Sequence, residues 1–107
     1  MIQKFVDVHP NSNIGEGTII CNFVTIEEDV VIGGNCWIGS GAVIMNGARI
    51  GNNVRVFPGA VISAVPQDLK FDGEASNVEI GDNTTIREYV TINRGTSASG
   101  TTRIGKN

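Results

Sequence analysis

The sequence has few aromatic side chains, one histidine, two cysteines and no long apolar run. Aromatic residues make up 6% of its 107 residues, so a core built on bulky rings is not expected. Cys21 and Cys36 are too few for the disulfide framework of a small secreted domain. No apolar stretch approaches the ~18 residues of a transmembrane helix, and residues 1–4 show no signal-peptide core. These absences favour a cytoplasmic protein with reduced thiols and no membrane insertion.

The charge is acidic overall and unevenly distributed. A net charge of −3 argues against nucleic acid or an anionic membrane as a partner. Residues 1–48 contain one basic side chain, Lys4, and five acidic ones, whereas residues 49–107 contain seven basic and six acidic. An acidic ligand is therefore expected to bind the second half of the chain.

A repeat of six residues runs through the chain. Every sixth position from residue 2 to residue 62 is aliphatic, and the same phase returns four times later in the chain. These positions are Ile2, Val8, Ile14, Ile20, Ile26, Ile32, Ile38, Ile44, Ile50, Val56 and Ile62, then Ile80, Ile86, Ile92 and Ile104. Of the fourteen isoleucines, only Ile19 lies outside this phase. Such self-similarity is typical of a repeat architecture.

Two further positions of the repeat are restricted. The residue two before each aliphatic one is small or β-branched, as in Val24, Cys36 and Ala42, and both point to the same side of a strand. Glycine often follows the aliphatic residue, at Gly15, Gly33, Gly39, Gly51, Gly81 and Gly105. With Asn and Asp nearby, glycine there predicts a corner that needs a positive φ.

A period of six fits neither a helix nor a hairpin sheet. Short strands joined by corners predict an all-β coil with three faces and about 18 residues per turn, in which parallel strands stack into three sheets. The chain is thus expected to form one β-helix domain, residues 1–107, with nearly six coils. Ile14, Ile32, Ile50 and Val54 are expected to be buried.

The repeat is interrupted twice while its phase is kept. Residues 64–77, AVPQDLKFDGEASN, place Asp68 and Glu74 where aliphatic residues belong, and the segment predicts a loop extruded from the prism. Residues 97–101, SASGT, form a second, smaller break. Loops on a rigid scaffold are frequent sites of function.

These motifs resemble a known family. The loop VPQDLKFDGE, followed by VEIGDNTTIREYVTINRGT, is similar to the UDP-N-acetylglucosamine acyltransferases, the hexapeptide-repeat family that begins lipid A synthesis. The match runs from Val8 to Asn107, with Phe71 in place of the usual Tyr and Asn93 where many members have His. The QDLK loop with IRE and NRGT is more specific than the hexads. The resemblance implies left-handed winding, because parallel crossovers are otherwise right-handed.

The resemblance also implies an activity. Family members transfer an (R)-3-hydroxyacyl group from acyl carrier protein to the 3-hydroxyl of UDP-N-acetylglucosamine, without a cofactor or metal, as homotrimers with active sites between subunits. Such a transfer needs a general base and donors for an oxyanion. The family's base is a histidine from a coil beyond residue 107, so this chain is expected to be an N-terminal fragment without further coils or the family's C-terminal helical domain, and inactive alone.

The residues carried over as substrate contacts are Gln67, Asp68, Leu69 and Lys70. Asp68 can accept a hydrogen bond from a hydroxyl, and Lys70 can place a positive charge near phosphate or an oxyanion. The alternative is a solvated loop with an Asp–Lys pair worth under ~1 kcal/mol.

Other polar residues have more ordinary interpretations. Cys36 occupies an inward position and is expected to pack, while Cys21 lies at a corner and is open to exposure, with nothing near it to lower its pKa. His9 is interpreted as structural. Three corner charges are expected to face solvent or a subunit interface, namely Arg87, Glu88 and Arg94.

Two other functions share this architecture. A hydratase of the γ-type carbonic anhydrase pattern needs three imidazoles around zinc, which one histidine does not supply. A non-catalytic trimeric scaffold or an ice-binding prism is the other alternative, and the cluster Thr84, Thr85 and Thr91 is the only hint of an outward threonine ladder. A different acyltransferase on the same repeat also remains open.

Overall fold

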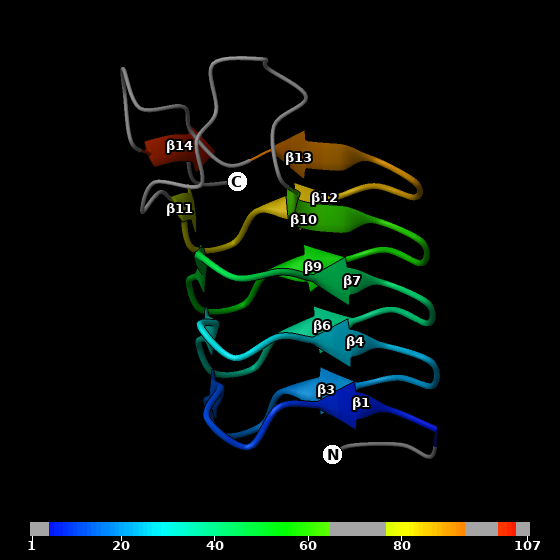
Figure 1. The fold of residues 1–107 in the computed structure, drawn as a ribbon. Coiled ribbons are helices and arrows are strands. Elements are labelled where there is room, and N and C mark those ends of the chain that lie inside the picture. The colour runs from blue at the N-terminus through cyan, green and yellow to red at the C-terminus, as the bar shows by residue number, and fades with distance from the viewer. Residues whose placement is uncertain (1–4, 65–76, 94–100, 105–107) are drawn as a thin grey trace.

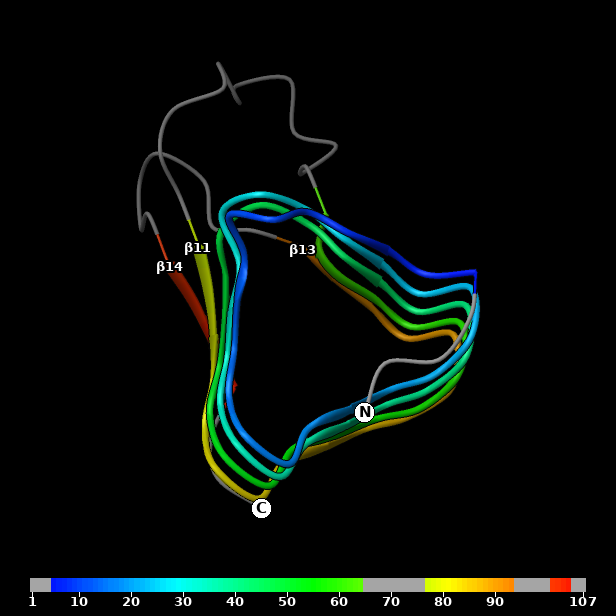
Figure 2. The same ribbon diagram turned by 90° about the horizontal axis from the view of Figure 1, so that it is seen from below.

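The computed structural model describes residues 5–64, 77–93 and 101–104, and within them every regular element is a β-strand. The strands coil into a triangular prism (Figures 1 and 2). Seen from the N-terminal end, the chain runs anticlockwise as it recedes, so the winding is left-handed (Figure 2). No described helix is long and apolar enough to cross a membrane.

In the described part of the chain, fourteen strands form three parallel sheets, one on each face of the prism. Sheet A contains β3 (Ile19–Ile20), β6 (Trp37–Ile38), β9 (Arg55–Val56) and β12 (Thr85–Ile86). Sheet B contains β1 (Asp7–Val8), β4 (Thr25–Ile26), β7 (Val43–Ile44), β10 (Val61–Ala64) and β13 (Thr91–Asn93). Sheet C contains β2 (Asn13–Ile14), β5 (Val31–Ile32), β8 (Ala48–Ile50), β11 (Asn77–Ile80) and β14 (Thr101–Ile104).

The register of the sheets stacks the aliphatic residues of the repeat. Ile14 pairs with Ile32, and Ile32 pairs with Ile50, each three hexads further along the chain. Ile26 and Ile44, which test the predicted phase, are 2% and 0% exposed. Ile32, Ile50 and Val54 are buried as predicted. The period of six therefore sets both the triangular section and its core.

Ile14 was predicted to be buried but is only half-buried. Its strand, β2, is the first of sheet C and pairs with β5 on one side only. A side chain in the first coil has a neighbouring coil on one side only, whereas side chains in the middle coils are covered on both sides. The hexad pattern identifies inward positions but not which of them lie at an open end.

The described strands make fewer coils than the predicted count of nearly six, since the sheets hold five, five and four strands. Paired strands are three hexads apart in the first coils, but Ile62 pairs with Ile92, five hexads on. Ile80 pairs with Ile104, four hexads on. Both interruptions add whole hexads between paired strands, so the aliphatic residues keep their phase. The added residues do not increase the number of stacked strands.

The left-handed backbone conformations occur at a different position of the repeat than predicted. With the exception of Ser63, they lie three residues after the aliphatic residue, as at Gly41 (φ 75°) and Asn35 (φ 57°), and not at the glycine directly after it. At that glycine the constraint is space, because a Cβ on Gly33 would lie 2.6 Å from the carbonyl oxygen of Gly51 in the next coil. Glycine there permits the close approach of successive coils.

Candidate functional site

Both long connections join strands that lie on either side of the same corner of the prism. Residues 65–76 join β10 to β11 and residues 94–100 join β13 to β14, so each leads from sheet B to sheet C. The predicted substrate contacts, Gln67, Asp68, Leu69 and Lys70, lie outside the described residues, as do the predicted loop projection and Arg94. The structure therefore places the strands before and after both connections on either side of one corner. We call it the B–C corner.

A bulge marks the start of the first connection. The pairing of β10 with β13 shifts register between Ile62 and Ala64, at the intervening residue Ser63. Ser63 is fully buried, has a φ of 67°, and its Oγ donates a hydrogen bond to the carbonyl oxygen of Asn46 at 2.6 Å. Bulges re-aim a strand, and a non-glycine residue with positive φ persists only where its surroundings hold it.

Polar side chains hold the B–C corner below this bulge. The Arg49 guanidinium pairs with the Asp29 carboxylate at 2.7 Å and donates to the Asp29 carbonyl oxygen at 3.0 Å. The Asn46 amide oxygen accepts from the Asp29 N–H at 3.0 Å, and the Asn46 N–H donates to the Glu27 carboxylate at 2.8 Å. Since Arg49 and Asp29 are partly exposed, their ion pair contributes modestly to stability. The network orients the corner that carries both connections.

Sequence reasoning missed this network. Its members are 17 to 20 residues apart, which is about one coil, so their contacts run between successive turns. The available signal was the recurrence of polar residues at this corner, at Asn11, Asp29 and Asn46. A repeat of six residues predicts where the corners lie, but not which polar side chains of successive coils meet there.

The single histidine lies at the same corner but in the first coil, away from both long connections. His9 follows β1, at the opposite end of sheet B from β13, and its Nδ1 accepts the Asn11 N–H at 3.1 Å. This contact agrees with a structural interpretation. Among the described residues, no group of three or more His, Cys, Asp or Glu side chains could hold a metal ion.

Both cysteines are buried. Cys36 points inward as predicted, and its Sγ donates to the Gly51 carbonyl oxygen at 3.1 Å. Cys21 was considered open to exposure but is only 8% exposed, and burial raises the pKa of its thiol. A raised pKa favours the protonated thiol, which agrees with a packing role for Cys21.

The threonine cluster does not form a ladder. Thr84 points into the core and is 5% exposed. Thr85 lies outward on sheet A and Thr91 outward on sheet B, so they occupy different faces. An ice-binding face needs threonines repeated on one face, and this cluster does not provide them.

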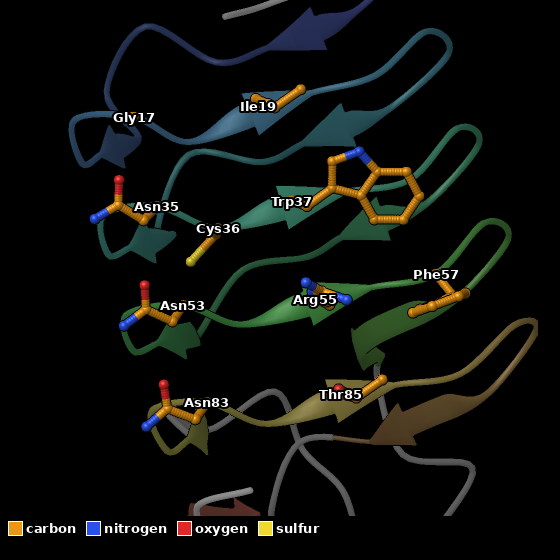
Figure 3. Close-up of a pocket in the computed structure, with 10 residues that line it drawn as sticks. All are labelled: Gly17, Ile19, Asn35, Cys36, Trp37, Asn53, Arg55, Phe57, Asn83 and Thr85. Atoms are coloured by element: carbon orange, nitrogen blue, oxygen red, sulfur yellow. The ribbon is translucent and has the colours of Figure 1, made fainter.

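Sheet A carries a groove of about 740 Å³ on its outer face. A column of three asparagines, Asn35, Asn53 and Asn83, borders one side, and the rings of Trp37 and Phe57 border the other (Figure 3). The rings meet edge to face, with centroids 5.7 Å apart. Sequence reasoning did not anticipate the groove, although Trp37 and Arg55 occupy the same outward position of paired strands.

Two of the predicted corner charges lie beside this groove. Arg87 stacks over the Phe57 ring, 4.3 Å from its centroid, and pairs with Glu88 at 3.2 Å. Both side chains are well exposed, as predicted, so the ion pair is worth little. Their role at a subunit interface stays a prediction.

Part of the sequence matches a known class of repeat protein. The family model described as "Bacterial transferase hexapeptide (six repeats)" matches residues 29–64. The acyl-[acyl-carrier-protein]–UDP-N-acetylglucosamine O-acyltransferase of Campylobacter lari is 43% identical over 108 residues, covering 94% of this chain and 41% of that protein. Residues 29–64 therefore match the hexapeptide repeat of bacterial transferases, which agrees with the period of six in the sequence.

Two solved structures are similar to this chain over its whole length. The UDP-N-acetylglucosamine acyltransferase of Bacteroides fragilis matches with a TM-score of 0.96 and 55% identity, over 100% of this chain and 42% of that one. That of Francisella novicida matches with a TM-score of 0.96 and 40% identity, over 100% and 40%. By sequence and by structure, this chain is a left-handed hexapeptide-repeat β-helix similar to the UDP-N-acetylglucosamine acyltransferases. It spans about two fifths of the length of these relatives.

Proposed function

We propose that this chain forms part of an enzyme that transfers an (R)-3-hydroxyacyl group from acyl carrier protein to the 3-hydroxyl of UDP-N-acetylglucosamine, the first step of lipid A biosynthesis. The observation that carries the proposal is the match to the Bacteroides fragilis acyltransferase, which extends over the whole chain at 55% identity. A likeness to the hexads alone would not separate this activity from those of other hexapeptide proteins.

Under this proposal, Gln67, Asp68, Leu69 and Lys70 contact the substrates. Asp68 accepts a hydrogen bond from a substrate hydroxyl, and Lys70 places its ammonium near phosphate or the developing oxyanion. The connection that contains them follows the buried bulge of Ser63 and links strands on either side of the B–C corner, where Arg49 pairs with Asp29. A general base then removes the proton of the attacking hydroxyl while the carrier thiolate leaves. We assign the base to a histidine beyond residue 107.

The proposal includes partners and a location. Acyl carrier protein is the donor, UDP-N-acetylglucosamine the acceptor, and the working form a homotrimer with active sites between subunits. The enzyme acts in the cytoplasm, and residues 1–107 form a single β-helix domain within it. The relatives' names supply the two substrates, and the remainder follows from the family resemblance of the VPQDLKFDGE and NRGT motifs.

A chimaera tests the proposal directly. Residues 1–107 replace the aligned part of the Bacteroides fragilis enzyme, and acylation of UDP-N-acetylglucosamine is measured with hydroxyacyl carrier protein as donor. We expect an active chimaera, since the two backbones match with a TM-score of 0.96. Asp68→Ala and Lys70→Ala are each expected to lower kcat/KM by about 10²-fold.

Asp72→Ala is the matched control for these variants. It removes a carboxylate from the same connection, at a position to which the resemblance assigns no role, and is expected to leave kcat/KM close to that of the unchanged chimaera. A folded but inactive chimaera would contradict the proposed reaction. Equal losses in Asp68→Ala and Asp72→Ala would contradict the residue assignment.

A further inference from the structure

The residues on both sides of the first long connection are bonded to one turn of the coil below. This turn, residues 45–48, joins β7 to β8 at the B–C corner, and we call it the anchoring turn. Just before the connection, the Ser63 hydroxyl donates to the Asn46 carbonyl oxygen at 2.6 Å. Just after it, the Val78 N–H donates to the Gly47 carbonyl oxygen at 2.9 Å. Two successive carbonyl groups therefore hold the chain where the connection begins and where it ends.

The anchoring turn is itself held from the next coil down. The Glu27 carboxylate accepts the Asn46 N–H at 2.8 Å, and the Asn46 amide oxygen accepts the Asp29 N–H at 3.0 Å. The buried Gly47, with a φ of 93°, donates its N–H to the Asp29 carbonyl oxygen at 2.7 Å. A hydrogen bond to a carboxylate is stronger than one between neutral groups. Glu27 therefore acts on one backbone group of Asn46, while Ser63 bonds to the other.

The ends of the second long connection stack on those of the first. Ala64 pairs with Asn93, the residue before the second connection, and Asn77 pairs with Thr101, the residue after it. A displacement of the anchoring turn would therefore be passed to the ends of both connections.

We infer that Glu27 and Asn46 are positioning residues for the substrate contacts of the proposed function. Through the anchoring turn, they fix the ends of the connection that contains Asp68 and Lys70, and neither residue touches a substrate. The inference rests on the proposed function for the role of Asp68 and Lys70. Groups that act on a substrate need accurate placement, and a misplacement of about 1 Å caused by a distant change can cost about 10²-fold in rate.

A pair of variants at Glu27 tests the inference in the chimaera described above. Glu27→Ala leaves the Asn46 N–H without its carboxylate and is expected to lower kcat/KM by about tenfold. Glu27→Gln keeps an oxygen that can accept this N–H, so it is expected to recover most of the loss. An equal loss in both variants would assign the effect to the charge of Glu27 and would overturn the role of the hydrogen bond.

Glu28→Ala is the matched control. Glu28 is the next carboxylate along the chain at the same corner, but it accepts from the Asn11 side-chain amide at 3.0 Å, in the first coil and away from the anchoring turn. Its replacement is expected to leave kcat/KM unchanged. Equal losses in Glu27→Ala and Glu28→Ala would count against a specific role for Glu27.

A double-mutant cycle separates positioning from a general loss of stability. Glu27→Ala is expected to lower kcat/KM less in an Asp68→Ala chimaera than in the unchanged one, because one of the groups that it positions is already absent. A variant that merely destabilised the fold would lower kcat/KM by the same factor in both. Full multiplication of the two losses would therefore contradict the inference.

Amide hydrogen exchange in the 107-residue chain tests the anchoring turn without an activity measurement. The Val78 N–H does not bond to Glu27, yet its exchange is expected to be about tenfold faster in Glu27→Ala than in the unchanged chain or in Glu28→Ala. Unchanged exchange at Val78 would reject the turn as an anchor.

The outcome is separable from that of the proposed function. An active chimaera in which Glu27→Ala has no effect would reject the positioning role and keep the acyltransferase. An inactive chimaera beside faster Val78 exchange in Glu27→Ala would reject the reaction and keep the anchoring turn.

Discussion

Glycine serves two different purposes within one hexad of this chain. At Gly41 it occupies a left-handed conformation with open space around it, since a Cβ there would meet no atom within 4 Å. At Gly33 the backbone needs no left-handed conformation, but the next coil passes too close for a side chain. The first purpose concerns strain within one residue, and the second concerns the distance between two coils.

These purposes predict unequal costs for alanine. Gly41→Ala is expected to cost about 1–2 kcal/mol, the strain of a left-handed L-residue. Gly33→Ala is expected to cost more, because its Cβ would contact the Gly51 backbone at 2.6 Å and successive coils would have to separate. Urea unfolding of both variants measures the difference. Equal costs would show that the coils yield more easily than the geometry implies.

Burial of Cys21 predicts a stability that depends on alkaline pH. Burial raises the thiol pKa above its ordinary 9.0, so above about pH 9 the unfolded chain releases the proton before the folded chain does. Stability is therefore expected to fall as the pH rises through this range. Cys21→Ala removes that contribution, and its unfolding midpoint should decline less between about pH 8 and about pH 10. Parallel declines in both proteins would contradict the burial of the thiol.

Most strands of the prism are two residues long. Such short strands are stabilised by pairing with the strands of the neighbouring coils. Ile32 pairs with Ile14 on one side and with Ile50 on the other, so its side chain is enclosed above and below. Ile14 is enclosed on one side only. The same residue type in the same strand position therefore contributes differently according to its coil.

Alanine substitution at these two positions measures the contribution of a coil neighbour. Ile32→Ala is expected to cost about 2–5 kcal/mol, the range for an enclosed aliphatic side chain. Ile14→Ala is expected to cost less, because the site is already open to water and leaves no closed cavity. Free energies of unfolding from urea titrations decide the comparison. A larger cost at Ile14 would mean that the first coil is covered in solution.

At the scale of the whole molecule, the one histidine lies several coils away from both long connections, although it belongs to the same corner. His9 lies beside β1, whereas those connections leave from β10 and β13, at the other end of sheet B. The 107-residue chain alone is therefore expected to show no measurable acyl transfer, because a missing general base typically costs about 10²–10⁴ in rate. Turnover of hydroxyacyl carrier protein by the purified chain would contradict this assignment of the base.

Much of the fold could be predicted because the repeat is a local property. The inward direction of a side chain such as Ile32 or Cys36 depends on its place among the neighbouring two or three residues. The position within the hexad therefore predicts it. The candidate site was less accessible. Gln67 to Lys70 came from a resemblance and lie outside the described residues. The contacts of Ser63 with Asn46 and of Arg49 with Asp29 form only when one coil closes on the next.

The period of six can be read from the amino-acid sequence, and the triangular section, the aliphatic core and the continuity of phase across both interruptions follow from it. Those features depend on side-chain alternation within a single hexad, which any coil of this composition must satisfy. The number of coils that the described strands make, and the corner that both connections share, are known only from the three-dimensional pairing of the strands. These depend on residues three to five hexads apart becoming neighbours, and such distances are set by the closing of the coil and not by the hexad.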